Sequence, residues 1–387
     1  MRDGKIIVAR LWPKYGGDTP SRTPVICGIN PQKYETICIY HTKNSDNPNV
    51  FEQNGKKVFY LTMKPSPGFF KFFAIFKLAM ILRKQKVNII HCHHHKSVVY
   101  GVIAGKLAGV PAIIAHVHGL GRTRNIRRKL LNLFIMPCID KILAVGGAVK
   151  KDIIANNPTV KPERIINIGN SIDYGYYSQG NFDRAAVRRK FNIPQDAFVF
   201  ATAGRLAETK GQKFLIEAFA QVKKQIPNAF LLLAGAGELK DELEKQVITL
   251  GCKDSVGFPG KVNNMPELYC ATDIFVLPSI AEGLPRGLME AMAAGVICIA
   301  SNAGGIPEIL DNGKFGFLVE PRDVNSLCLA MLKAANLPGG EKTQMISAAR
   351  EQIRKNFSHS IIIEKETKIY DTLIEEKIEH KKIKEAL

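Results

Sequence analysis

The stretch Glu282-Gly-Leu-Pro-Arg-Gly-Leu-Met-Glu290 decides the fold that this sequence predicts. An apolar, strand-like run at residues 273–278 precedes it, and its second half opens a helix-like pattern over residues 286–294 that stops at Gly295. A second apolar run follows at residues 296–300. This order predicts a strand, loop, helix and strand of an open α/β sheet, with a polar loop at the carboxyl end of the first strand, where such sheets bind ligands.

The chemistry of this loop suits a nucleotide sugar. Free backbone N–H groups at the start of the helix can bind a phosphate. The carboxylates of Glu282 and Glu290 can accept hydrogen bonds from sugar hydroxyls. A buried helix with solvated carboxylates is the alternative reading of the same residues.

Alternating strand-like and helix-like patterns occur twice along the chain. The 387 residues are 46% hydrophobic, which suffices for two domains with separate cores. Two arrays of this kind predict two Rossmann-like domains and not one barrel, with the joint near residues 172–182. The expected strands are residues 5–11, 36–41, 58–62, 87–91, 112–117 and 141–145, then 198–203, 230–234, 273–277 and 296–300; the clearest helices are 69–85, 98–108 and 212–225.

Composition indicates an intracellular protein. Eight scattered cysteines, without a Cys-x-x-Cys pair, predict buried thiols in a reducing compartment. The first residues resemble a strand and not a signal peptide, and the longest apolar segment, residues 69–82, contains lysines and is too short to span a bilayer. We therefore expect a cytoplasmic protein.

The positive charge is concentrated in the first half of the chain. Residues 1–173 contain 27 Lys and Arg against 9 Asp and Glu, whereas residues 174–387 contain 27 against 26. Such asymmetry indicates an anionic partner. Residues 69–86 and 122–134 mix aromatic or leucine side chains with cations, as interfacial helices do, so we expect an anionic membrane surface. A core-facing helix with a basic solvated face is the alternative for residues 69–86, and no nucleic-acid-binding signature is present.

The region around the two glutamates resembles the retaining glycosyltransferases of family 4, which have the two-domain GT-B fold. The signature of that family is two glutamates with seven residues between them, preceded by Pro-Ser and followed by Glu-Ala-Met-Ala-x-Gly. The whole run of residues 273–321 fits it. The matching segments are Leu277-Pro-Ser279, Glu282-Gly-Leu-Pro285, Glu290-Ala-Met-Ala-Ala-Gly295 and Ala303-Gly-Gly-Ile-Pro-Glu308.

The resemblance implies a fold and a domain plan. Two Rossmann-like α/β domains would face each other across a cleft. Residues 1–173 would form an acceptor-binding domain, and residues 174–360 would form the nucleotide-sugar-binding domain. Residues 361–387 would form a helix that packs back on the first domain.

Two cations after the strand at residues 198–203 suit a diphosphate. Arg205 follows the turn at Gly204, and Lys210 precedes a predicted helix. Arginine binds phosphate oxygens bidentately and lysine supplies a compact charge, so the pair can neutralise a departing diphosphate. The family's Gly-Arg, Lys-Gly element holds the donor pyrophosphate; two unrelated surface cations are the alternative.

The resemblance also implies roles for several other residues. Glu290 would bind ribose hydroxyls, and Glu282 with the backbone of Gly283 and Leu284 would bind the donor sugar. The turn at Gly237 and the segment ending at Val262 would line the nucleobase pocket.

In the first half, the resemblance assigns His118 and Gly17. His118 ends a predicted strand and would face the transferred sugar, with His116 on the same side of that strand; a structural histidine is the alternative. Gly17 lies in the loop that would close over the diphosphate, although the helix expected after that loop is not evident at residues 19–24.

The run His91-Cys-His-His-His95 has the appearance of a metal site. The family has a strand-end His-x-His here without a metal, and the chain lacks the Asp-x-Asp dyad that holds a divalent ion in the other major glycosyltransferase fold. We therefore expect no cofactor and no metal.

Together these features predict a retaining, metal-independent glycosyltransferase. It would move a sugar from a UDP-, GDP- or ADP-sugar to a lipid-linked or saccharide acceptor in the synthesis of envelope polysaccharide, lipopolysaccharide or glycolipid. It would act on the inner face of the cytoplasmic membrane as a peripheral protein. A nucleotide-sugar epimerase of the same fold and a non-catalytic nucleotide-sugar-binding relative remain as alternatives.

Overall fold

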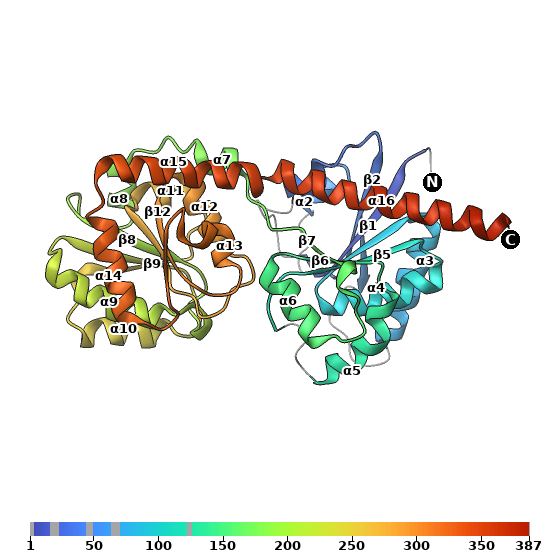
Figure 1. Cartoon of the computed structure of the whole chain (residues 1–387), viewed down its shortest axis with the longest axis horizontal. Coiled ribbons are helices and arrows are strands. Elements are labelled where there is room, and N and C mark those ends of the chain that lie inside the picture. Colours follow the sequence, from blue (N-terminus) through green and yellow to red (C-terminus); the bar gives the residue numbers. More distant parts are fainter. Residues whose placement is uncertain (1–3, 16–22, 44–48, 63–69, 122–125, 387) are drawn as a thin grey trace. The chain divides into compact units, whose positions relative to one another are not determined.

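The chain divides into two α/β units, each built on a parallel sheet (Figure 1). Unit 1 contains residues Met1–Ser171 and His359–Leu387, and unit 2 contains Ile172–Ser358. The boundary lies two residues before the expected one, and the C-terminal segment belongs to unit 1. The computed structural model describes residues 4–15, 23–43, 49–62, 70–121 and 126–386.

Within the described residues, unit 1 has a seven-stranded parallel sheet in the order β3-β2-β1-β4-β5-β6-β7. The pairing of β4 with β5 places His93 opposite His116. The strands are β1 (Ile6–Lys14), β2 (Tyr34–Thr42), β3 (Lys57–Thr62), β4 (Ile89–His93), β5 (Ala112–Val117), β6 (Lys141–Ala144) and β7 (Ile165–Asn167).

Helices cover both faces of this sheet. On one face, Tyr370 and Leu373 of α16 are buried in a core with Val8, Ile89 and Ile114 of the strands. On the other face, α4 lies so close that a Cβ at Gly101 would be 2.1 Å from Cys92 Sγ. The helices are α1 (Thr23–Cys27), α2 (Val50–Gln53), α3 (Phe70–Lys84), α4 (His95–Ala108), α5 (Ile126–Ile135), α6 (Gly147–Asn156) and α16 (His359–Ala386).

Unit 2 has a six-stranded parallel sheet in the order β10-β9-β8-β11-β12-β13. Buried aliphatic residues fill a core on each face of this sheet. The strands are β8 (Phe198–Ala203), β9 (Ala229–Ala234), β10 (Val256–Gly260), β11 (Ile274–Leu277), β12 (Ile297–Ser301) and β13 (Phe317–Val319). The helices are α7 (Tyr174–Ser178), α8 (Arg184–Lys190), α9 (Gln212–Gln225), α10 (Lys240–Thr249), α11 (Met265–Ala271), α12 (Arg286–Ala294), α13 (Ile306–Leu310), α14 (Val324–Ala335) and α15 (Gly339–Asn356).

The predicted β4 strand, residues 87–91, is displaced by two residues. The structure has β4 at Ile89–His93, because residues 85–88 form a turn and a bend before it. The Oδ1 of Asn88, in the bend, accepts a hydrogen bond from Ile7 N of β1 at 2.8 Å. Two of the four histidines of the His91–His95 run, His91 and His93, therefore lie on the strand. His94 precedes α4, and His95 is the first residue of that helix.

The expectation that all cysteines are buried is wrong for three of them. All eight are free thiols, but Cys27, Cys138 and Cys270 are partly exposed. The first two lie at the ends of short helical segments and the third lies in α11, near the surface of unit 2.

Helix α3 exposes aromatic residues. Phe72 is 83% exposed, Phe73 and Phe76 are exposed beside it, and Leu78 is buried on the opposite side. The cation in the middle of the helix, Lys77, donates to the carbonyls of Tyr60 and Leu61 and so anchors α3 to β3. The aromatic face of α3 is therefore not core-facing. In the part of the chain that the structure describes, no helix combines the length and apolar character that crossing a membrane requires.

Candidate active site

The loop between β11 and α12 holds Glu282 in a salt bridge. Lys210 Nζ lies 2.5 Å from Glu282 Oε1, and Ser279 Oγ donates to the same oxygen at 2.8 Å. The side chains of Lys210 and Glu282 are 25% and 10% exposed, so solvent screens their attraction only in part. These contacts fix the direction of the Glu282 carboxylate.

A close approach of two backbones gives this loop its shape. Gly304 has φ +58°, and a Cβ there would lie 1.8 Å from the carbonyl oxygen of Glu282. Only glycine fits such a position. The glycine pair of the Ala303–Glu308 motif therefore supports the loop that carries Glu282.

The second glutamate, Glu290, is held on both carboxylate oxygens. Tyr269 Oη donates to Oε2 at 3.2 Å, and Arg286 donates to Oε1 at 3.1 Å from one turn earlier in α12. Burial and the Glu290 charge raise the pKa of Tyr269 and of Tyr177, so both phenols stay protonated and can donate to the carboxylate. The carboxylate is thus oriented and buried before any ligand arrives.

A cavity of about 400 Å³ connects Glu290 with the glycine turns after β8 and β9. Arg205 is an exposed cation at its edge. Its lining also includes Gly287, in the first turn of α12, where backbone N–H groups have no partner within the helix. The cavity is lined by Ala203, Gly204, Arg205, Ala234, Gly235, Ala236, Lys261, Val262, Met265, Gly287 and Glu290.

The structure brings most of the expected donor-binding residues of unit 2 together. Gly204, Arg205, Val262 and Glu290 share the cavity. The ion pair of Lys210 and Glu282 is adjacent to it, because a Cβ at Gly204 would meet Lys210 Cε at 3.9 Å. Gly283 and Leu284 follow Glu282 in the same loop, and the side chain of Leu284 is buried.

Gly237 has a packing role. A Cβ there would lie 2.2 Å from the carbonyl oxygen of Leu206, so a larger residue would separate the turns after β8 and β9. Gly237 does not line the cavity, whereas Gly235 does. Packing thus explains this glycine without a contact to a nucleobase.

Sequence reasoning missed the residues that orient the two glutamates. Tyr269 lies in a helix of buried residues, where its hydroxyl has no sequence signal. Arg286 precedes Glu290 by four residues, a helical spacing typical of an ion pair, and this signal could have found it. Ser279 belongs to the Pro-Ser motif, but that motif alone does not show that the serine hydroxyl donates to Glu282.

Unit 1 contains a second cavity, of about 420 Å³, at the carboxyl ends of β4 and β5. His116 and the exposed His118 both line it, and their rings stack with centroids 4.2 Å apart, so the two side chains do lie on the same side of β5. The lining residues are Trp12, Pro13, Lys14, His94, His95, Lys96, Val98, Ala115, His116, Val117, His118, Arg128 and Met136. Gly17 lies outside the described residues.

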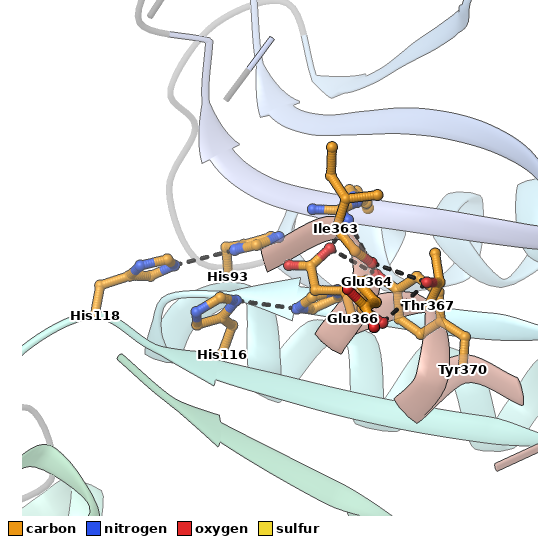
Figure 2. A network of polar contacts seen from close by, with 10 residues as sticks. His93, His116, His118, Ile363, Glu364, Glu366, Thr367 and Tyr370 are labelled. Carbon is orange, nitrogen blue, oxygen red and sulfur yellow. Dashed lines mark hydrogen bonds and ion pairs between the residues drawn. The ribbon is translucent and has the colours of Figure 1, made fainter. Parts of the chain in front are cut away.

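Behind this cavity, buried histidines join a polar network with α16 (Figure 2). His93 Nδ1 lies 3.0 Å from His118 Nε2, and His91 Nε2 lies 3.2 Å from His116 Nδ1. His91 Nδ1 lies 2.7 Å from Tyr370 Oη on α16. Burial, followed by the neighbouring histidines and Arg10, lowers the pKa of His91, His93 and His116 well below the ordinary histidine value, so these rings are neutral at pH 7.

The two parallel sheets, with ligand-sized cavities at the carboxyl ends of their strands, define a two-domain Rossmann-like protein of the GT-B class. Sequence models of two families match the chain. "Glycosyl transferases group 1" matches residues 183–352, and "Glycosyltransferase Family 4" matches residues 31–175. The chain therefore belongs to the glycosyltransferases of group 1 and family 4.

Several characterised relatives are similar in sequence. An Escherichia coli enzyme, UDP-Gal:alpha-D-GlcNAc-diphosphoundecaprenol alpha-1,3-galactosyltransferase, is 29% identical over 68% of this chain and 70% of its own. The N-acetyl-alpha-D-glucosaminyl L-malate synthase of Bacillus anthracis is 28% identical over 78% of this chain and 79% of its own.

Solved structures show the same fold. A glycosyltransferase from Rickettsia africae has a TM-score of 0.81 at 21% identity, with 96% of this chain and 99% of that chain covered. Anabaena HepE, solved in complex with UDP and glucose, has a TM-score of 0.77 at 22% identity, with 94% and 99% covered. The predicted family and fold class are therefore confirmed.

Proposed function

We propose that this protein is a retaining glycosyltransferase that takes a sugar from a nucleotide-diphosphate donor. The observation that carries the proposal is the cavity of unit 2, where the carboxylate of Glu290 and the cation Arg205 face one space of about 400 Å³ beside the Lys210–Glu282 pair. A carboxylate suits ribose hydroxyls, and cations with helix N–H groups suit a diphosphate. HepE, which shares the fold, was solved with UDP and with UDP-glucose.

In the proposed reaction the acceptor hydroxyl attacks the anomeric carbon from the side on which the diphosphate leaves. The new bond joins the acceptor oxygen to that carbon, and the bond from carbon to phosphate oxygen breaks. The diphosphate takes the electron pair, and its departing oxygen takes the acceptor proton. Arg205 and Lys210 stabilise the negative charge that develops, while Glu282 with the backbone of Gly283 and Leu284 holds the sugar.

The cavity of unit 1 is the proposed acceptor site. It combines apolar walls, from Trp12, Val98 and Met136, with the cations Lys14 and Lys96. Such a lining suits a sugar attached to a phosphate-bearing lipid. The E. coli relative is named for a diphosphoundecaprenol acceptor and a Staphylococcus aureus relative for capsular polysaccharide biosynthesis, which supports an envelope acceptor. His118 would contact the transferred sugar.

A panel of UDP-, GDP- and ADP-sugars tests the donor class. We expect one nucleotide family to bind the purified protein by calorimetry and to be hydrolysed slowly without acceptor. Failure of every nucleotide sugar to bind would contradict the proposal. Conversion of the donor sugar into its epimer without acceptor would instead indicate an epimerase.

We expect turnover to need no divalent metal. Arg205 and Lys210 can neutralise the diphosphate, and no Asp-x-Asp dyad is present to hold a metal–diphosphate complex. Initial rates with the preferred donor should be unchanged after dialysis against EDTA. Complete loss of activity that Mg²⁺ or Mn²⁺ restores would show this expectation to be wrong.

We also propose that unit 1 binds the anionic inner surface of the cytoplasmic membrane. Phe72, Phe73, Phe76 and Met80 form one exposed face of α3, and Arg83 and Lys84 end the same helix. On α5, exposed Ile126, Leu130 and Phe134 accompany Arg127 and Arg128. Apolar side chains among cations are typical of interfacial helices. Arg124, predicted to contribute, lies outside the described residues.

Replacing the aromatic face should weaken this binding. In the double variant Phe72→Ser/Phe76→Ser, flotation with anionic vesicles should fall at least about tenfold, since burying each Phe contributes roughly 1.5–3 kcal/mol. The matched control is Ile248→Ser/Leu329→Ser, which removes two exposed apolar side chains of unit 2. Wild-type binding should also weaken as salt rises. Equal flotation with anionic and neutral vesicles at low salt would contradict the proposal.

A further inference from the structure

Four histidines of unit 1 are stacked on two neighbouring strands. His91 and His93 lie on β4, whereas His116 lies on β5 and His118 follows it. The ring centroids of His91 and His93 are 4.5 Å apart, and those of His93 and His116 are 5.1 Å apart. Figure 2 shows His93, His116 and His118 of this cluster, with a dashed line between the rings of His93 and His118.

Two ring nitrogens of this cluster have no partner. Nε2 of His93 and Nε2 of His116 are buried, and neither forms a hydrogen bond with any residue that the structure describes. A buried polar nitrogen without a partner destabilises a fold, so the unpartnered Nε2 of His93 points to a group bound among these rings.

We propose that His91, His93 and His116 bind a divalent transition-metal ion of the zinc class. One ligand nitrogen from each of the three rings lies within 4.8 Å of the others. His91 Nε2 and His116 Nδ1 are 3.2 Å apart, close to the separation of about 3.3 Å between two imidazole nitrogens on a tetrahedral zinc. Three histidines with one open coordination position form a known type of zinc site.

The surrounding network can set the ring tautomers that metal binding needs. Arg10 donates to Tyr370 Oη at 3.1 Å, and Arg10 also pairs with Glu366. If Tyr370 in turn donates to Glu366, then His91 donates from Nδ1 to Tyr370 and presents a lone pair at Nε2. Such a hydrogen bond behind a ligating histidine orients the ring and strengthens the ligand.

Only the lone pair of a ring nitrogen binds an ion. The hydrogen bond between His91 Nε2 and His116 Nδ1 therefore opens when the ion binds, and the proton of His116 moves from Nδ1 to Nε2. The positive charge of Arg10 is offset by the carboxylate of Glu366. The ion's own charge would be reduced by a hydroxide or an acceptor oxygen in the open position.

The open position would face the cavity of unit 1, because His116 lines that cavity. A bound ion would therefore compete with the acceptor and inhibit transfer; this consequence rests on the proposed function, whereas the binding itself does not. Inhibition by a bound ion is consistent with the expectation that turnover needs no metal, because EDTA would then remove an inhibitor and not a cofactor.

The test measures metal binding by the full-length protein after removal of metals with EDTA. Titration with Co²⁺ should produce the visible absorption of a tetrahedral nitrogen-ligated ion, and Zn²⁺ should displace it at one equivalent. The variants His93→Gln and His116→Gln should each weaken Zn²⁺ binding by about 100-fold, and Tyr370→Phe, which removes the bond behind His91, by about tenfold.

The matched control is His95→Gln. His95 lines the same cavity but lies outside the group of three, with its Nε2 2.9 Å from Asn132 Oδ1. Its Zn²⁺ affinity should equal that of the wild type, and circular dichroism should show all variants folded. Absence of the Co²⁺ spectrum in the wild type, which would mean that water satisfies the two nitrogens, would overturn the proposal. Equal loss in the His95 and His116 variants would also overturn it.

Discussion

The variant Glu290→Ala should lose nucleotide binding while the protein stays folded. The Glu290 carboxylate is buried and oriented by Tyr269 and Arg286 in the cavity proposed for the donor. Hydrogen bonds to two ribose hydroxyls contribute roughly 1–3 kcal/mol each, so affinity should fall about 100-fold or more. Glu290→Gln keeps the size of the side chain and should still lose at least about tenfold.

The control for this experiment is Glu351→Gln. Glu351 is a glutamate of α15 that pairs with Arg354 and Lys355 on the surface of the same unit. Its donor affinity by calorimetry should be unchanged. Nucleotide affinity equal to that of the wild type in Glu290→Ala would show that the carboxylate does not bind the ribose.

Acidification from pH 7.5 to 5.5 should strongly destabilise unit 1. Burial, followed by the charge of Lys96, lowers the pKa of His41 to about 3, and the pKa values of His91, His93 and His116 are also far below 6.5. Above about pH 6.5 these rings are neutral in the folded and in the unfolded chain. Below that pH they gain a proton only when the chain unfolds. The free energy of unfolding therefore falls by about 1.4 kcal/mol per histidine between pH 7.5 and pH 5.5.

Urea unfolding at the two pH values, in EDTA, measures this effect. The four histidines together should remove roughly 5 kcal/mol of stability, and His41→Gln should reduce the pH dependence by about a quarter. Carboxylates ionise at lower pH and contribute little in this window. A pH dependence identical in the wild type and His41→Gln would contradict the assignment of a buried, neutral His41.

The sequence predicts the helix of the donor site well because its signals are local. The prediction of residues 286–294 agrees with α12, which begins after Pro285 and ends at Gly295 with φ +85°. The strands β8 and β5 are also predicted to the residue, since each is a buried apolar run between turn residues. Local pattern and periodicity thus suffice for the central elements.

Short strands at the sheet edges escape the same reasoning. β10, Val256–Gly260, contains Pro259 and two glycines, and β13 has only three residues. Neither provides the alternation or the apolar length that identifies a strand. The sequence does not predict helix α1 for a similar reason: its five residues are too few to show a helical period.

The histidine network depends on contacts that no local pattern contains. His91 and His93 are two residues apart on one strand and so share a face of the sheet. Their approach to His116, however, follows from the pairing of β4 with β5. Tyr370 and Glu366 reach this place from a helix more than 270 residues further along the chain. The sequence could therefore suggest a cluster in His91–His95 but not its partners.

The configuration of the product tests the central claim most directly. The protein would be incubated with the nucleotide sugar that it binds and a lipid-linked acceptor, and the anomeric proton of the transferred sugar would be observed by NMR. Retaining transfer predicts an α-linked product from an α-linked donor. A β-linked product would contradict the account. Conversion of the donor sugar into its epimer, without transfer to the acceptor, would also contradict it.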